Sequence, residues 1–411
     1  MILIHRACYT GFMNKVGILL ISGIFILLVS ACQSSIPVPP VMTTSALENT
    51  DIPVETAIST TSAASTSSVP VSWKLEVVAE NLYVPWSLVF TSPDRMLVTE
   101  RSGTIREIVN GELRTEPVYQ FNDIAAQDEA GLMGMAIDPA YLDNNYLYAC
   151  YTYQQDGSLF NRVVRLRDGV GQITLDGTVI EQIPSASNHA GCRLAFAPDG
   201  TLFVTAGDAL QPEKAQDITS LAGKILRVNS DGSIPQDNPF PNSPVYSLGH
   251  RNPQGLDWDL DSGLLYATEH GPSGFDGAPG GDEINLIQAG GNYGWPLVSH
   301  EESMEGMISP LIVFTPAEAP AAGMFYSGSV FSQYAGDFFF GALRGEGLVR
   351  VRLLDGDPRE IIEVEKIIDT VGRIREVVEG PDGYIYFTTS NRDGRGTLNS
   401  GDDRIYRLIP Q

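Results

Sequence analysis

A short turn-and-strand unit recurs along this chain and constrains its fold more than any other feature. The segments PDRMLVTE at Pro93, PDGTLFVTAG at Pro198 and PDGYIYFTTS at Pro381 each place a turn before an apolar strand that contains threonine near its end. LDSGLLYATEHG, near Asp259, is a looser copy. Such repetition is typical of a β-propeller, in which each blade repeats one antiparallel sheet around a ring.

The rest of the chain after Ser72 also has a β-type pattern. Short runs rich in Val, Ile, Tyr, Phe and Thr are bounded by Gly, Asp, Asn and Pro, and no long helical period is evident. The expected strands are RMLVTE, IREIV, YLYACYTY, RVVRLR, TLFVTAG, LLYATE, GLVRVRL, YIYFTTS and RIYRL. At about 45 to 55 residues per blade, this length gives six or seven blades. We predict an all-β, six-bladed β-propeller, with a β-sandwich carrying long insertions as the structural alternative.

The N-terminal region has the layout of an export signal. Lys15 precedes a long apolar run, and small residues then lead to Cys32 in the order Val-Ser-Ala-Cys, which resembles a bacterial lipobox. We interpret residues 1–32 as a lipoprotein signal peptide, with an uncleaved membrane anchor as the alternative. Residues 33–71, rich in Ser, Thr and Pro, read as a disordered tether, and residues 72–411 as the propeller domain. The expected location is outside the cytoplasm, with the membrane contacted only through lipid on Cys32.

The net charge limits the classes of partner that the protein can bind, and the cysteine content limits its possible redox states. The net charge of -24 argues against nucleic acid or an anionic membrane surface as a partner. Cys150 and Cys192 are the two cysteines that follow Cys32. Export permits a disulfide between them, but two free buried thiols fit the sequence equally well, so their pairing stays open.

The segments that carry chemistry lie between expected strands. Residues 249–295 contain GHRNPQG, EHGP and GGDEINLIQAGGNYGWP, whose glycines let the main chain approach a ligand closely. Arg251 can bind a carboxylate through two hydrogen bonds, and Glu283 and free carbonyls are the hard oxygen ligands that calcium prefers. One such loop is equally well explained as a turn, whereas three in succession favour a ligand site.

Two further segments hold candidate catalytic and anion-binding groups. In SNHAGCRLAFAPDGTLFVTAGD, His189 is a candidate general base, because histidine titrates near neutral pH, and Asp208 can orient its ring. In VGRIREVVEGPDG, Arg373 and Arg375 lie two residues apart and are expected on one face of a strand. The alternatives are a structural histidine and solvated arginine ion pairs.

Taken in order, these segments resemble the soluble quinoprotein glucose/sorbosone dehydrogenase family, also called aldose sugar dehydrogenases. The matching motifs run from VPWSLVFTSPDRMLVTERSGTI at Val84 through GLMGMAIDPAYLDNNYLY, NHAGCRLAFAPDG, AQDITSLAGKILRVNSDGSIPQDNPF, GHRNPQG and NYGWP to RIREVVEGPDGYIYF. The resemblance implies a six-bladed propeller that binds pyrroloquinoline quinone (PQQ) and Ca²⁺ and oxidises the C1 hydroxyl of aldoses to lactones. It also implies an external electron acceptor, such as a quinone or a cytochrome.

The resemblance implies a role for each matching residue. His189 corresponds to the base that takes the hydroxyl proton while hydride passes to the quinone, Asp208 to its acidic partner, and Arg251 to the arginine at the quinone oxygens. The implied cofactor-binding positions are Glu129, Arg251, Asn252, Arg344, Arg373 and Arg375. The resemblance implies two calcium sites: the carbonyls of Gly271 and Pro272 correspond to the calcium at the cofactor, and Glu283 and the Tyr293 carbonyl correspond to a second site.

The chain departs from the family pattern in three places. Glu129 stands where some members have a glutamine that contacts the cofactor, so we expect either a raised pKa for this carboxyl or a side chain that faces elsewhere. Arg344 replaces a lysine, which keeps the charge and changes the shape. The insertion SGFDGAPG after Pro272 is expected to alter substrate access beside the implied calcium.

Two other functions fit parts of the pattern. A calcium-dependent lactonase or esterase would use the metal as a Lewis acid and would have no need for a group of arginines. A non-catalytic propeller that binds glycans or proteins would need neither His189 nor the arginines. The presence of both features in one chain favours the dehydrogenase interpretation.

Overall fold

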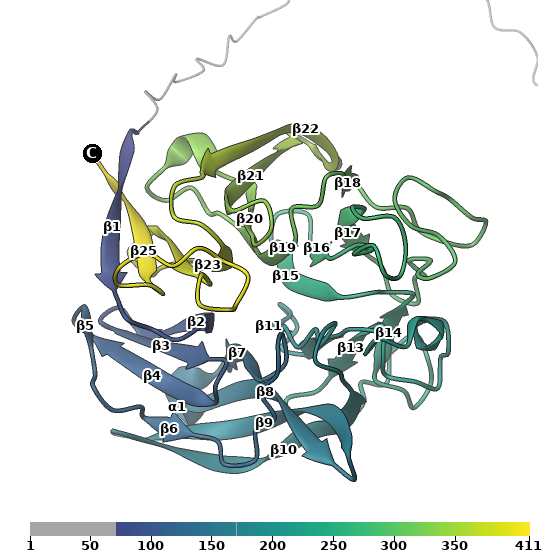
Figure 1. Cartoon of the computed structure of the whole chain (residues 1–411), viewed down its shortest axis with the longest axis horizontal. Helices are drawn as coiled ribbons and strands as arrows, with labels where there is room; N and C mark the ends of the chain where they lie inside the picture. Colours follow the sequence, from purple (N-terminus) through teal and green to yellow (C-terminus); the bar gives the residue numbers. More distant parts are fainter. Residues whose placement is uncertain (1–70, 170) are drawn as a thin grey trace, which may run out of the picture. The chain divides into compact units, whose positions relative to one another are not determined.

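The described part of the chain, residues 71–169 and 171–411 of a computed structural model, is almost entirely β-structure. Its strands form six antiparallel sheets arranged around a centre, as Figure 1 shows. The prediction of an all-β, six-bladed propeller is therefore confirmed. Helical structure in these residues is limited to α1 (Tyr141–Asn144) and two short 3₁₀ turns, Pro212–Ala215 and Ser332–Tyr334. No helix among them has the length and apolar character needed to span a membrane.

The first three blades follow one another along the chain. Blade 1 consists of β2 (Pro85–Ser92), β3 (Arg95–Glu100), β4 (Thr104–Val109) and β5 (Glu112–Leu113), with β6 (Tyr119–Gln120) paired to β4. Blade 2 consists of β7 (Leu132–Ile137), β8 (Tyr146–Gln155), β9 (Ser158–Gly169) and β10 (Gln172–Pro184). Blade 3 consists of β11 (Leu194–Phe196), β12 (Leu202–Ala206), β13 (Lys224–Val228) and β14 (Val245–Leu248).

The remaining three blades complete the ring. Blade 4 consists of β15 (Pro253–Asp259), β16 (Leu264–Glu269), β17 (Asp282–Ile287) and β18 (Ile312–Phe314). Blade 5 consists of β19 (Pro320–Phe325), β20 (Phe338–Ala342), β21 (Gly347–Leu354) and β22 (Asp357–Ile368). Blade 6 consists of β23 (Ile374–Glu379), β24 (Ile385–Thr389), β25 (Ile405–Pro410) and β1 (Trp73–Ala79).

The repeated segment noted in the sequence has one structural meaning. In blades 1, 3 and 6 it forms the turn after the innermost strand and then the second strand, which is β3, β12 or β24. The looser copy near Asp259 does the same in blade 4, where it leads into β16. These second strands are buried on both faces, which explains their nearly continuous apolar sequence.

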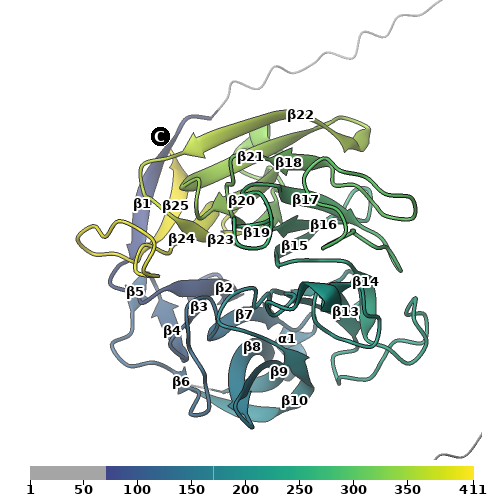
Figure 2. The ribbon, with the colours of Figure 1, turned by 45° about the vertical axis from the view of Figure 1, so that its right-hand side comes forward.

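The two ends of the described chain close the ring. β1 pairs antiparallel with β25, with Leu75 opposite Leu408 and Val77 opposite Tyr406, and Figures 1 and 2 both show β1 beside the C-terminal strand. The innermost strands β2, β7, β11, β15, β19 and β23 each contact the next, and β23 contacts β2. No innermost strand is therefore left as an open edge in this part of the chain.

Hydrophobic cores lie between neighbouring blades. Six clusters of buried apolar side chains are present in the described residues, and each joins two adjacent sheets. Tyr148 and Leu194, for example, belong to the core between blades 2 and 3. Tyr266 and Phe340 belong to the core between blades 4 and 5. This packing fixes the blades against one another and leaves their connecting loops at the rim of the ring free to form a site.

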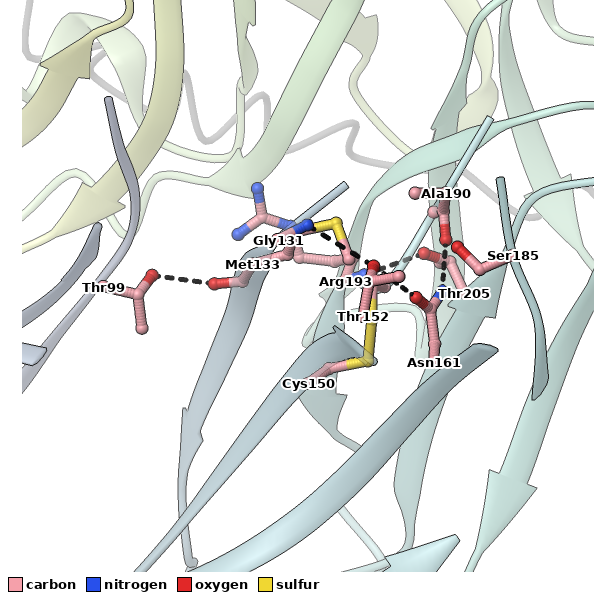
Figure 3. The surroundings of a disulfide bond; sticks show 12 residues. Thr99, Gly131, Met133, Cys150, Thr152, Asn161, Ser185, Ala190, Arg193 and Thr205 are labelled. Atoms are coloured by element: carbon pink, nitrogen blue, oxygen red, sulfur yellow. Dashed lines mark hydrogen bonds between the residues drawn. A yellow bond between two sulfur atoms is a disulfide. The ribbon is translucent and has the colours of Figure 1, made fainter. Parts of the chain in front are cut away.

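A disulfide joins blades 2 and 3 and resolves the question that the sequence left open. Cys150 in β8 bonds to Cys192 just before β11, with Cα atoms 5.8 Å apart (Figure 3). The same segment is held by Asn161, whose Nδ2 donates to the Ala190 carbonyl over 2.7 Å. Since the bridge spans 42 residues of sequence, it stabilises the folded state by about 4 kcal/mol in the chain-entropy model.

The expected signal peptide at 1–32, lipidated Cys32 and residues 33–70 of the expected tether lie outside the described residues and stay predictions. Val71, the last residue assigned to the tether, is described. Its amide donates to Gln333 Oε1 over 3.2 Å, and Gln333 Nε2 donates to its carbonyl over 2.8 Å. Val71 is therefore held against the 3₁₀ turn of blade 5.

Candidate functional site

The histidine and aspartate singled out in the sequence form a buried pair. His189 Nδ1 and Asp208 Oδ1 are 2.7 Å apart, and both side chains are buried. Trp295 Nε1 donates to the other carboxylate oxygen over 2.8 Å, and the Leu210 amide donates to Oδ1 over 2.8 Å. These bonds orient the Asp208 carboxylate so that it accepts a hydrogen bond from the Nδ1–H of His189, which leaves Nε2 as the basic nitrogen.

The loop that carries His189 has an unusual backbone. His189 has a φ of 56°, in the left-handed region that few residues other than glycine adopt. Gly207, directly before Asp208, packs so closely that a Cβ there would overlap the His189 carbonyl. The glycine of TAGD therefore allows the two loops to touch, and the disulfide at Cys192 helps to hold the strained residue in place.

Glu129 faces the site and is ionised. Its Oε2 accepts from the His189 amide over 3.0 Å and from Asn252 Nδ2 over 3.2 Å, while Oε1 accepts from Arg395 over 3.0 Å. Burial alone would raise the pKa of this carboxyl, but nearby cationic groups, of which Arg395 is hydrogen-bonded to it, outweigh burial and lower the pKa to about 2. The expectation of a raised pKa or an outward side chain is wrong, because Arg395 compensates the charge.

Asn252 and Gln254 extend this network across the centre of the ring. Asn252 Oδ1 accepts from the Gly191 amide over 3.1 Å and from Gln254 Nε2 over 3.0 Å. Gln254 Oε1 accepts in turn from Arg375 over 2.9 Å. The innermost polar groups of blades 3, 4 and 6 are thus linked by hydrogen bonds.

Arg251, which belongs to the GHRNPQG segment, is almost fully buried and contacts the insertion. Its Nε donates to Asp276 over 2.7 Å, and its terminal nitrogens donate to the His270 carbonyl and to Ser273 Oγ, each over 3.1 Å. The Trp295 ring centre lies 5.5 Å from the guanidinium carbon. Two of the three partners come from the inserted segment, so the insertion contacts a residue of the predicted site directly.

The two arginines near the C-terminus are buried, which excludes a solvated strand face. Arg373 forms an ion pair with Asp393 over 2.7 Å and donates to the Leu343 carbonyl over 2.6 Å. Arg375 contacts Gln254 but has no carboxylate within ion-pair distance among the described residues, and burial lowers its pKa. It remains a cation at physiological pH, as arginine does in proteins.

Arg344 differs from the other predicted arginines. It lies two residues after the end of β20, its side chain is exposed, and it has no hydrogen-bond or ion-pair partner among the described residues. Only its amide is bonded, to the Glu318 carbonyl over 2.9 Å. Its guanidinium is therefore free to bind an anion.

The four predicted calcium-binding residues line one small cavity. Gly271, Pro272, Glu283 and Tyr293 face it together with Glu269. Burial, followed by the charge of Glu269, raises the pKa of Glu283 to about 8. Within 71–169 and 171–411 no three His, Cys, Asp or Glu side chains converge in a metal-binding arrangement. A cation in this cavity would therefore depend on carboxylates together with main-chain carbonyls, a donor set that suits calcium.

Buried donors without acceptors mark where an anionic group fits. Arg193 and Arg375 both contact Gln254, and Nη2 of Arg193 and Nε of Arg375 have no hydrogen-bond partner. Leaving a buried donor unpaired costs about 1–3 kcal/mol. A ligand with several carboxylates would supply the missing acceptors, so these residues fit the cofactor that the resemblance implies.

Several site residues were missed by the sequence reasoning. They compensate charge or orient other groups and come from blades distant in sequence: Arg101, Gln254, Trp295, Asp393 and Arg395. Arg395 lies 266 residues from Glu129. Gln254 and Trp295 lie within the GHRNPQG and NYGWP segments already singled out. For Asp393 and Arg395 the available signal was that the loop after YIYFTTS emerges at the same end of its blade as TAGD does.

A family comparison covers most of the described structure. A model of the family described as glucose/sorbosone dehydrogenase matches residues 82–405. This range begins before β2 and reaches the first residue of β25. It contains every residue predicted for the site.

Individual relatives are similar over most of their length. The aldose sugar dehydrogenase of Escherichia coli is 33% identical over 353 residues, which are 80% of this chain and 92% of that protein. The quinoprotein glucose dehydrogenase B of Acinetobacter calcoaceticus is 34% identical over 257 residues, 54% of this chain and 52% of that protein. The PQQ-bound aldose sugar dehydrogenase of Streptomyces coelicolor has a TM-score of 0.72 and 33% identity, covering 83% of this chain and 99% of that one.

Glu129→Gln tests the charge compensation at the site. The pKa of Glu129 is about 2 in the folded protein and 4.5 for an ordinary glutamate. Ionised Glu129 therefore stabilises the fold at pH values above 4.5, and this stabilisation is lost as the pH falls from 4.5 toward about 2. Urea titrations should show wild type more stable than the variant near neutral pH, with the difference shrinking below about pH 4.5. Glu116→Gln, at an exposed position, is the control. A difference that stays constant with pH would contradict the account.

Proposed function

Because the chain belongs to the glucose/sorbosone dehydrogenase family, and is thus a quinoprotein oxidoreductase of the sugar dehydrogenase type, we propose that it oxidises the C1 hydroxyl of aldoses to lactones with PQQ and Ca²⁺. The observation that carries this proposal is the buried His189–Asp208 pair, linked through Glu129, Asn252 and Gln254 to Arg375, a buried cation without a carboxylate partner among the described residues. A base and an anion-binding wall at one place are what such a reaction requires.

His189 is the proposed general base. Asp208 holds Nδ1 over 2.7 Å, so Nε2, which has no hydrogen-bond partner among the described residues, can accept the proton of the C1 hydroxyl. Asp208 also stabilises the imidazolium that forms, since its carboxylate lies next to the ring. Trp295 keeps the carboxylate in place through its indole N–H.

The arginines and Asn252 are the proposed cofactor-binding residues. The cofactor PQQ would supply a two-electron acceptor for the hydride of C1, with a quinone or a cytochrome as the external acceptor that reoxidises it. Arg251 and Asn252 would face its quinone oxygens, and Arg344, Arg373 and Arg375 its carboxylates. Glu129 positions Asn252 and the His189 backbone, and Arg395 keeps its charge compensated.

Neither alternative function is favoured by an observation of its own. A lactonase or esterase would leave the buried Arg251, Arg373 and Arg375 without a purpose in catalysis. A non-catalytic binding propeller would leave the His189–Asp208 pair unused.

His189→Ala should abolish sugar oxidation while PQQ binding stays nearly unchanged, because the imidazole moves a proton and the arginines supply the affinity. Loss of a general base lowers the rate by on the order of 10²–10⁴-fold. Steady-state dye reduction gives turnover, and quenching of protein fluorescence gives cofactor affinity. Normal turnover per bound cofactor in this variant would place the base elsewhere.

Glu283→Gln tests the proposed calcium site without reference to activity. Ca²⁺ in excess of its dissociation constant should raise the melting temperature of the wild type, because a ligand stabilises the state that binds it. The variant should show much less of this shift, since it lacks a carboxyl group that can ionise to bind the cation, and Glu116→Gln should keep the shift. An equal shift in Glu283→Gln would move the cation away from this cavity.

A further inference from the structure

The insertion places an aromatic ring against the proposed base. Phe275 lies between β16 and β17 in the inserted segment, and its side chain is 69% exposed. Its ring is nearly parallel to that of His189, with 5.8 Å between centroids and 25° between planes. Direct face-to-face rings lie closer, so this is an offset stack. Part of the Phe275 ring therefore extends beyond the imidazole.

Buried polar contacts fix this ring in place. Asp276, the next residue, pairs with Arg251 over 2.7 Å, with side chains that are 7% and 3% exposed. The other oxygen of Asp276 accepts from the Ser273 amide over 2.9 Å. Gly280 donates to the Pro272 carbonyl over 3.2 Å and closes the base of the loop. The exposed aromatic ring is thus held on a rigid support.

We propose that Phe275 is a substrate-specificity residue, whose ring packs against the C–H face of an aldopyranose and brings its C1 hydroxyl to His189. The Phe275 ring stacks on the ring of the proposed base, and a pyranose has one face made largely of C–H groups that such a ring can cover. Asp276 acts as a positioning residue, because it ties the loop to Arg251. This inference rests on the proposed function, in that an aldose is the substrate.

The chemistry of the ring predicts which kinetic constant it affects. Phe275 has no group that can take a proton or an electron pair, so it contributes to binding and orientation rather than to proton transfer. Loss of one apolar contact of this size changes substrate affinity by roughly 10- to 200-fold. The cofactor is bound by charge and hydrogen bonds, which Phe275 does not supply.

The test compares Phe275→Ala and Phe275→Tyr with the wild type, all loaded with PQQ and Ca²⁺. The KM for glucose is measured together with the Ki of 1,5-anhydroglucitol, a pyranose that lacks the C1 hydroxyl and cannot be oxidised. We expect Phe275→Ala to raise both constants about 10-fold or more, with a smaller change in kcat and unchanged PQQ affinity. Phe275→Tyr, which keeps the aromatic ring, should have KM and Ki values close to those of the wild type.

Leu260→Ala is the matched control, because this exposed apolar residue follows β15 at the opposite end of the same blade. Unchanged KM and Ki in Phe275→Ala, with an active wild type, would overturn this inference and leave the proposed function standing. A wild type that binds PQQ but oxidises none of the aldoses offered would overturn both. Asp276→Asn should raise the same two constants if the Arg251 contact positions the ring, and no effect would remove Asp276 from the account.

Discussion

The site depends on closure of the ring by β1 and β25. Glu129, His189, Asn252, Gln254 and Arg375 come from segments of blades 2, 3, 4 and 6. A continuous chain of hydrogen bonds links them, and the closed ring brings these segments together. Antiparallel pairing of the first and last described strands closes the ring. The six hydrophobic cores fix the angle between each pair of neighbouring blades. The strands are thus a rigid frame, and the chemistry lies in loops at the rim of that frame.

Charge compensation explains how an acidic chain keeps a cationic site. Asp393 neutralises Arg373, Asp276 neutralises Arg251, and Arg395 neutralises Glu129. Glu376 neutralises Arg193, whereas Arg375 has no carboxylate partner in the described structure. Buried charges are normally paired, so this imbalance is the strongest physical indication that an anionic ligand belongs there.

Much of the fold and part of the site could be predicted from the sequence. The strands and the blade count follow from local patterns of apolar and turn residues, and the His189–Asp208 pair follows from two motifs that flank adjacent strands of one blade. The partners of Glu129 and Arg251 could not be found this way, because Arg395 and Asp276 lie in loops without a periodic pattern. The disulfide was also beyond reach, since two cysteines that are 42 residues apart fit either a bond or free thiols.

The central claim is that residues 71–411 form a PQQ-dependent aldose dehydrogenase. The most direct measurement is the absorption spectrum of the purified protein, reconstituted with PQQ and Ca²⁺, before and after anaerobic addition of glucose. The account predicts that the bound cofactor is reduced by the sugar and that removal of calcium by a chelator prevents the change. A spectrum that shows bound PQQ but stays oxidised with every aldose offered would contradict the account.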